Sequence, residues 1–143
     1  MEKTSDRRLL LLDTHIWIWL MAGAGELNAE SRRIINSALE MGMLRIAAIS
    51  LWETALLASR GRILLGKSTG SWVQEALAGP GPAIEPLTAA IAIESYALPD
   101  RFHQDPADRM IVATARVTGA VLMTRDQGIL CYAERGHLTA LQA

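Results

Sequence analysis

The 143-residue chain is long enough for one domain and leaves little room for a second. Half of its residues are apolar and 20% are charged, which is typical of a globular domain. The net charge of −1 excludes a strongly basic surface, so any contact with nucleic acid must be local. The single cysteine, Cys131, excludes an internal disulfide and disfavours a cysteine-based zinc site.

The amino terminus does not resemble a signal peptide. Residues 1–8 form a polar, charged tail, and Asp13 interrupts the apolar segment that follows. The longest later apolar run, 16–22, is far shorter than the roughly 20 residues that a membrane span requires. We therefore expect a cytoplasmic protein that does not contact a membrane.

Short apolar runs alternate with longer segments of helical pattern. Residues 9–12 form a buried strand, because four apolar residues in a row are too few for a helix. Asn28 is a helix cap and Gly42 a helix stop. In chain order the pattern predicts strand 9–12, helix 15–22, helix 28–41, strand 44–49, helix 50–59, helix 70–78, strand 84–87, helix 88–98, helix 105–118, strand 120–123, helix 127–134 and an edge strand over 138–141.

Strands that alternate with helices indicate an α/β fold. We expect one domain over residues 1–143, with a central, mainly parallel sheet of four to five strands and helices on both faces. The residues after the first strand, Asp13-Thr14-His15, are not a Gly-rich turn, which excludes a dinucleotide-binding domain. In parallel sheets ligands bind at the carboxyl ends of the strands.

Four acidic residues are expected to meet at that edge. Asp13 directly follows the first strand, and Asp126 follows the fourth by three residues. Glu53 and Asp108 lie near the starts of two helices, and helices in such folds begin where strands end. Elements far apart in the sequence therefore deliver four carboxylates to one place.

Each acid also has a structural explanation when taken alone. Ser50 and Glu53 have the spacing of a capping box. Asp105 precedes a proline at the first helical position, and Asp126 is placed to cap the last helix. Asp13 is harder to explain in this way, because a carboxylate at the end of a buried strand needs a positive partner.

Carboxylates brought together repel one another unless a cation neutralises them. The only lysines, Lys3 and Lys67, lie in segments predicted to be exposed, and carboxylate oxygens suit Mg²⁺ or Mn²⁺. The spacing of His15 and His103 matches no ligand motif, so we expect structural or exposed roles for both. Four arginines either hold a phosphate backbone or form solvated helix faces: Arg60, Arg62, Arg109 and Arg125.

Four ordered segments together resemble a PIN domain and, more narrowly, the VapC-type toxins of type II toxin–antitoxin systems. These segments are 11–17, 50–53 with the downstream 60–62, 98–116 and 122–126. The resemblance implies a Rossmann-like PIN fold, and Thr14 and Thr124 match positions that hydrogen-bond the acids. It assigns a metal-binding cluster to Asp13, Glu53, Asp108 and Asp126, with Asp105 as a candidate fifth acid.

The function that follows is that of a Mg²⁺-dependent endoribonuclease toxin, in which Mn²⁺ substitutes for Mg²⁺. Such an enzyme hydrolyses an RNA substrate with a metal-activated water and is inhibited by a cognate antitoxin protein. The alternative is a PIN-like binding module with little or no nuclease activity.

A run of six apolar residues, 16–21, points to a surface that binds another protein. If it is helical, its side chains surround the whole cylinder, and at least one large one points outward. We therefore hypothesise that Trp17 or Trp19, extended by Trp52 and Leu56, marks the interface of a homodimer or the antitoxin site. Alternatively, neighbouring helices cover the whole run.

Overall fold

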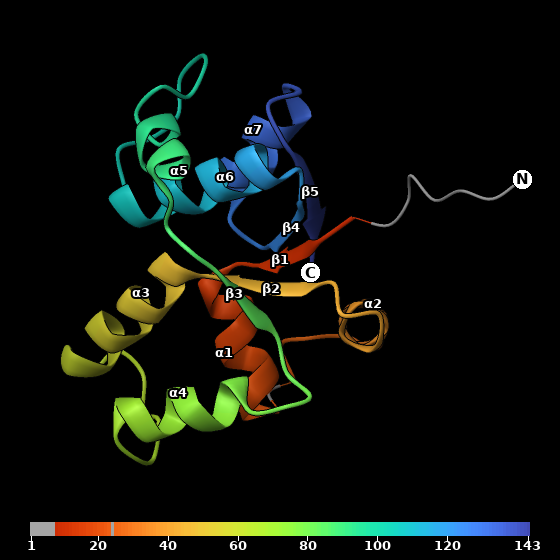
Figure 1. Ribbon diagram of the computed structural model, residues 1–143, viewed down its shortest axis with the longest axis vertical. Coiled ribbons are helices and arrows are strands. Elements are labelled where there is room, and N and C mark those ends of the chain that lie inside the picture. Colours follow the sequence, from red (N-terminus) through yellow and green to blue (C-terminus); the bar gives the residue numbers. More distant parts are fainter. Residues whose placement is uncertain (1–7, 24) are drawn as a thin grey trace, which may run out of the picture.

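A five-stranded, all-parallel sheet forms the centre of the computed structural model, which describes residues 8–23 and 25–143 (Figure 1). Within these residues the strand order is β3-β2-β1-β4-β5. The strands are β1 (Leu10–Leu12), β2 (Leu44–Ala47), β3 (Ala83–Glu85), β4 (Val121–Thr124) and β5 (Thr139–Gln142). The predicted α/β class and parallel sheet are confirmed. Apart from Arg8, the predicted polar tail of residues 1–8 lies outside the described residues.

Helices cover both faces of the sheet. Figure 1 shows α5, α6 and α7 on one side and α1 and α4 on the other. None of the helices in the described part of the chain has the length and apolar character that crossing a membrane requires. The helices are α1 (Thr14–Ala22), α2 (Ala29–Glu40), α3 (Ala48–Ser59), α4 (Thr69–Leu77), α5 (Ala89–Glu94), α6 (Pro106–Thr118) and α7 (Gln127–Glu134).

The central strand β1 separates two apolar layers. Leu10 and Leu12 pack into the layer formed with α1, α2 and α4, whereas Leu11 packs into the layer formed with α6 and α7. Successive side chains of a strand point to opposite faces, so an unbroken apolar run suits a strand that is covered on both sides. The site at the end of β1 therefore has a rigid, buried base.

The turn from β2 into α3 differs from the prediction. The strand ends at Ala47 and the helix begins at Ala48, so strand 44–49 and a Ser50 cap are both wrong. Ala47 occupies the cap position and makes no side-chain cap hydrogen bond. Ser50 lies inside the first turn, where its buried hydroxyl is 2.8 Å from Thr14 Oγ1. A tertiary contact therefore uses the hydroxyl that the capping box would need.

Helix α5 is shorter than predicted and ends at Glu94 rather than near residue 98. In a longer helix the Tyr96 N–H would bond the carbonyl oxygen of Ala92, but the Ser95 hydroxyl donates to that oxygen at 2.7 Å, and the Tyr96 N–H bonds Ile93 at 3.2 Å. The carbonyl oxygen of Ser95 accepts from Arg109 Nε at 2.8 Å. The remaining elements begin and end within a few residues of their predicted bounds.

The apolar run in α1 is mostly covered by neighbouring elements. Trp17 is 0% exposed, and its ring meets that of Trp72 in α4 edge-on at 5.0 Å between centroids. The hypothesis that Trp17 marks an interface is therefore wrong, because α4 packs over the side of α1 that carries it. Trp19 is partly buried, and Trp52 on α3 remains 54% exposed.

Candidate metal centre

Four acidic side chains from four separate elements line one cleft at the carboxyl edge of the sheet. Asp13 follows β1, and Asp126 lies between β4 and α7. Glu53 comes from α3, and Asp108 from the first turn of α6. The structure thus brings together the four acids that were predicted to meet. The cleft has a volume of about 410 Å³, and its other lining residues are His15, Ile16, Trp19, Asp105 and Arg125.

Asp13 is the most buried of these acids, with only 8% of its surface exposed. Its Oδ1 accepts a hydrogen bond from the Thr14 backbone N–H at 2.8 Å, and its Oδ2 accepts one from the Thr124 hydroxyl at 2.6 Å. Burial raises the pKa of the Asp13 carboxyl, and the Thr124 hydrogen bond acts in the opposite direction. The fold therefore holds this carboxyl in a fixed orientation. Burial disfavours its charged form, and a bound cation would offset that penalty.

Thr14 and Thr124 connect the acids to one another, as the resemblance implied. The Thr14 hydroxyl donates to Glu53 Oε1 at 2.6 Å. The Thr124 hydroxyl, which donates to Asp13, accepts from the Asp126 backbone N–H at 3.0 Å. Because each threonine binds groups from two elements, it fixes the separation of the carboxyls as well as their orientation. Burial also raises the pKa of Glu53, with Asp13 as a further cause.

Three of the acids that line the cleft also cap helices. Asp13 occupies the N-cap position of α1, which was not predicted, whereas Asp105 and Asp126 cap α6 and α7 as predicted. Asp126 Oδ1 accepts from the Ile129 N–H at 3.0 Å at the start of α7. Asp105 Oδ1 accepts from the N–H groups of Ala107 and Asp108 at the start of α6, and its side chain is exposed. Capping and a place in the cleft are compatible, because a carboxylate has several acceptor sites.

The ionisation of Asp108 is strongly perturbed. Burial is the largest cause, followed by the negative charges of Asp13, Asp105, Asp126 and Glu53, and together they raise the pKa of Asp108 to about 8. A carboxyl in this state is protonated at neutral pH unless a cation arrives. The cluster is therefore short of positive charge.

The described arginines and lysines form no ion pair with the four acids. Among residues 8–23 and 25–143, no lysine or arginine nitrogen lies within 4.0 Å of a carboxylate oxygen of the four acids. Arg109, a candidate for binding phosphate, is 8% exposed and donates to the carbonyl oxygens of Ser95, Phe102 and His103. That candidate role is wrong, because its guanidinium ties α6 to the preceding loop.

The other candidate arginines differ in their position. Arg125 lines the cleft, donates to the carbonyl oxygens of Glu26 and Ala143, and lies 4.9 Å over the Trp19 ring. Arg60 and Arg62 follow the end of α3 and do not line the cleft. Arg125 is therefore the arginine that the structure places beside the acids.

His103 is a site residue that sequence reasoning missed. Its Nε2 lies 3.3 Å from Asp108 Oδ2, and potential ligand atoms of His103, Asp108 and Asp126 lie within 4.8 Å of one another. No ligand spacing in the sequence identifies it. The one available signal is its position two residues before Asp105, the cap of α6.

The chemistry of these donors fits a hard divalent cation. Carboxylate oxygens dominate the cluster, and such ligands suit Mg²⁺ or Mn²⁺ better than zinc. The raised pKa values of Asp13, Glu53 and Asp108 indicate that the cluster gains stability when a cation binds. The acids thus form a candidate metal site, and their roles as ligands remain predictions.

We expect the metal-free protein to lose stability as the pH rises from about 4 to about 8. In this window the folded protein keeps a proton on Asp108, whose pKa rises from 3.8 to about 8, whereas the unfolded chain releases it. The rise in pH therefore lowers the free energy of unfolding. The loss over the whole window is about 1–2 kcal/mol after allowance for solvent screening. Thermal denaturation in EDTA at pH 5 and pH 8 measures the effect. The Asp108→Asn variant should lose much less stability over this window, and an equal loss would contradict the assignment.

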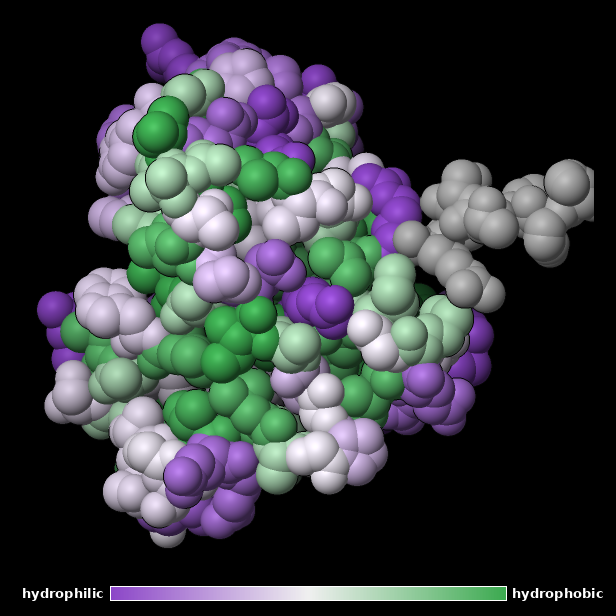
Figure 2. Space-filling model, viewed as in Figure 1, coloured by the Kyte–Doolittle hydropathy of each residue, from purple (hydrophilic) through white to green (hydrophobic). Residues whose placement is uncertain are grey.

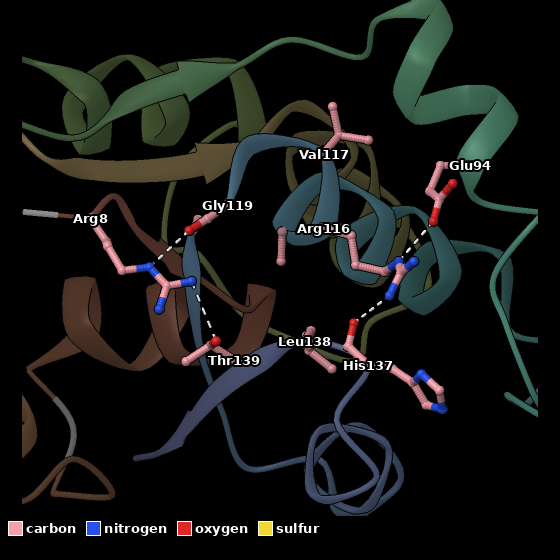
Figure 3. A pocket seen from close by; sticks show the side chains of 10 residues that line it. Arg8, Glu94, Arg116, Val117, Gly119, His137, Leu138 and Thr139 are labelled. Carbon is pink, nitrogen blue, oxygen red and sulfur yellow. Dashed lines mark hydrogen bonds and ion pairs between the residues drawn. The ribbon is translucent and has the colours of Figure 1, made fainter. Parts of the chain in front are cut away.

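A second cleft, of about 430 Å³, lies at the opposite edge of the sheet, by the amino ends of β4 and β5. Figure 3 shows Arg8 bridging the Gly119 carbonyl and the Thr139 hydroxyl. Arg116 bridges Glu94 at 2.7 Å and the His137 carbonyl at 2.5 Å. These arginines tie α5, α6 and β5 together. Glu94 is the one carboxylate among the residues that line this cleft, and it is paired with Arg116. This cleft therefore lacks the cluster of unpaired acids that would attract a cation.

Comparison with known proteins agrees with this architecture. Residues 10–134 match the family model described as PIN domain. The chain is 39% identical over 118 residues to Ribonuclease VapC22 of Mycobacterium tuberculosis, a match that covers 82% of this chain and 87% of that protein.

Solved structures show a similar fold. One is VapBC2 from Rickettsia felis bound to a DNA fragment from their promoter, with a TM-score of 0.68, 14% identity and coverage of 94% of this chain and 98% of that chain. Another is a toxin–antitoxin complex from Klebsiella pneumoniae, with a TM-score of 0.55, 25% identity and coverage of 82% and 87%. Since the family model spans most of the chain and the sequence relative covers a similar part, this chain belongs to the PIN domain family, within which it is related to the VapC toxins.

Proposed function

We propose that this PIN domain protein is a metal-dependent endoribonuclease and the toxin of a type II toxin–antitoxin system, acting as a single domain. The observation that carries the proposal is the acid cluster, in which four separate elements deliver carboxyls to one cleft and Asp108 has a pKa of about 8. The 39% identity to a protein named as a ribonuclease supports the choice of RNA as substrate.

The chain's own residues prepare the site for a cation. When bound, Mg²⁺ or Mn²⁺ supplies positive charge and an activated water for hydrolysis of a phosphodiester. Thr14 and Thr124 keep Glu53 and Asp13 oriented before the cation arrives, so that little reorganisation is needed. Four carboxylates are proposed to hold the ion: Asp13, Glu53, Asp108 and Asp126.

The wall of the cleft offers a surface for RNA. Arg125 lies over the Trp19 ring, and both residues line the cleft beside the acids. Bonds to the carbonyl oxygens of Glu26 and Ala143 hold this guanidinium over the ring, and because it still lines the cleft, its charge can attract phosphate. We propose that Arg125 and Trp19 contact the substrate next to the bond that is cleaved.

We expect single-stranded RNA to be cut into products with 5′-phosphate and 3′-hydroxyl ends, and only when Mg²⁺ or Mn²⁺ is present. Hydrolysis by an activated water leaves these ends, whereas attack by the 2′-hydroxyl leaves a cyclic phosphate. Labelled RNA, analysed for its end groups with and without EDTA, tests this. A main product with a 2′,3′-cyclic phosphate would overturn the mechanism. Metal binding without cleavage of any RNA would favour the binding-module alternative.

The proposed protein partners are a cognate antitoxin and a second copy of this chain. Figure 2 shows apolar surface on the side of the molecule where α3, α4 and β3 lie. Trp52, Ile84 and Leu87 are 54%, 40% and 49% exposed. Large apolar side chains gathered at a surface commonly mark a protein interface. Sedimentation of the purified chain, alone and with a candidate antitoxin, measures both associations.

A further inference from the structure

His103 occupies a defined position beside the acid cluster. Its ring stacks on Phe102 at 4.3 Å between centroids and 28° between planes. Phe102 is 8% exposed and belongs to the core layer under α6, so the stack rests on a fixed base. On the α7 side, a Cβ atom added to Gly128 would lie 3.1 Å from His103 Cδ2. Phe102 and the start of α7 therefore hold the imidazole in place, and 41% of the His103 side chain is exposed to solvent.

Two roles are compatible with the distance of 3.3 Å between His103 Nε2 and Asp108 Oδ2. As a metal ligand, Nε2 would offer a lone pair, and the ring proton would sit on Nδ1. As a hydrogen-bond donor, Nε2 would carry the proton and Nδ1 the lone pair.

The other ring nitrogen distinguishes these roles. The backbone N–H of Asp105 donates to His103 Nδ1 at 3.4 Å. A ring nitrogen that accepts a hydrogen bond does so with its lone pair and carries no proton. The proton of the neutral ring therefore lies on Nε2. That arrangement makes Nε2 a donor to Asp108 and removes the lone pair that a metal would need.

We infer that His103 is a positioning residue, which donates from Nε2–H to Asp108 Oδ2 and leaves the other oxygen of that carboxylate to bind the cation. The inference rests on the proposed role of Asp108 as a ligand. Groups that hydrogen-bond to metal ligands orient them, and their loss commonly weakens metal binding about 10- to 100-fold. His103 is thus expected to act through Asp108 without touching the ion.

Titration with Mn²⁺, followed by the electron paramagnetic resonance of the free ion, separates the outcomes. His103→Phe keeps a ring to stack on Phe102 and removes both nitrogens, so its Mn²⁺ affinity should fall about 10- to 100-fold. His103→Gln offers an amide N–H near the position of Nε2 and should stay within about threefold of the original protein, because the donor is kept. Circular dichroism and thermal denaturation establish that each variant is folded.

Pulsed electron paramagnetic resonance of the Mn²⁺-loaded natural protein provides a readout that needs no variant. A donor role predicts no coupling from a directly bound ¹⁴N nucleus. Such a coupling, or a His103→Phe variant that binds Mn²⁺ as tightly as the natural protein, would overturn the inference. Asp108→Asn in the same titration tests the underlying proposal. If it also binds Mn²⁺ normally, the metal site itself is wrongly assigned, whereas weak binding by Asp108→Asn beside normal binding by His103→Phe overturns only the role of His103.

Discussion

Replacing Asp108 with asparagine should abolish RNA cleavage and leave the fold intact. Asparagine has nearly the same shape, but it removes the negative charge that the proposed metal site requires at the start of α6. Losing a group that stabilises the charge of the reaction typically costs on the order of 10³-fold in rate. Single-turnover cleavage of labelled RNA in Mg²⁺ measures the loss, and Mn²⁺ titration should show a parallel loss of affinity.

Two further variants provide controls for this result. Asp13→Asn should be as inactive as Asp108→Asn, because both acids are proposed to hold the same ion. Asp105→Asn should be much milder, because asparagine also caps helices well and the Asp105 side chain is exposed. Near-normal turnover by Asp108→Asn would refute the site, and a loss at Asp105 as deep as that at Asp13 would add Asp105 to the ligands.

The sequence predicted the edge of the sheet where the acids meet, because two simple rules suffice. The short apolar run before Asp13 indicates a strand covered on both faces, and parallel strands end at one edge. Each acid either follows a strand or lies near the start of a helix, and these positions place all four at that edge. The threonines that orient the carboxyls were implied by the family resemblance alone.

Contacts between distant segments were beyond these rules. Ser50 has the spacing of a capping residue, but Thr14, which is distant in the sequence, lies against its hydroxyl inside α3. In the sequence, Arg109 resembles a surface arginine in a polar segment. In the structure its guanidinium is buried and donates to three backbone carbonyl oxygens of the preceding loop. In each case a tertiary partner determines the role of a polar group, and local spacing carries no information about that partner.

The apolar run of α1 leads to the second large expected effect. Trp17→Ala should destabilise the protein by about 3–5 kcal/mol, because it deletes a large, fully buried side chain and leaves a cavity against Trp72. The melting temperature should fall by about 10 °C or more. Thermal and urea denaturation measure the loss. Trp17→Phe should cost less, since it keeps an aromatic ring and removes an indole N–H that has no acceptor among the described residues.

Trp19→Ala is the matched variant from the same helix, and it should separate stability from binding. Trp19 is only partly buried, and it lines the acid cleft with Arg125 over its ring, so its loss should cost about 1 kcal/mol of stability. Its larger effect should be a weaker association with RNA or with an antitoxin segment that enters the cleft, measured as a rise in Kd with Mn²⁺ binding unchanged. If Trp19→Ala unfolds the protein as readily as Trp17→Ala, both tryptophans belong to the core. If it alters neither binding nor stability, the proposed wall of the cleft lies elsewhere.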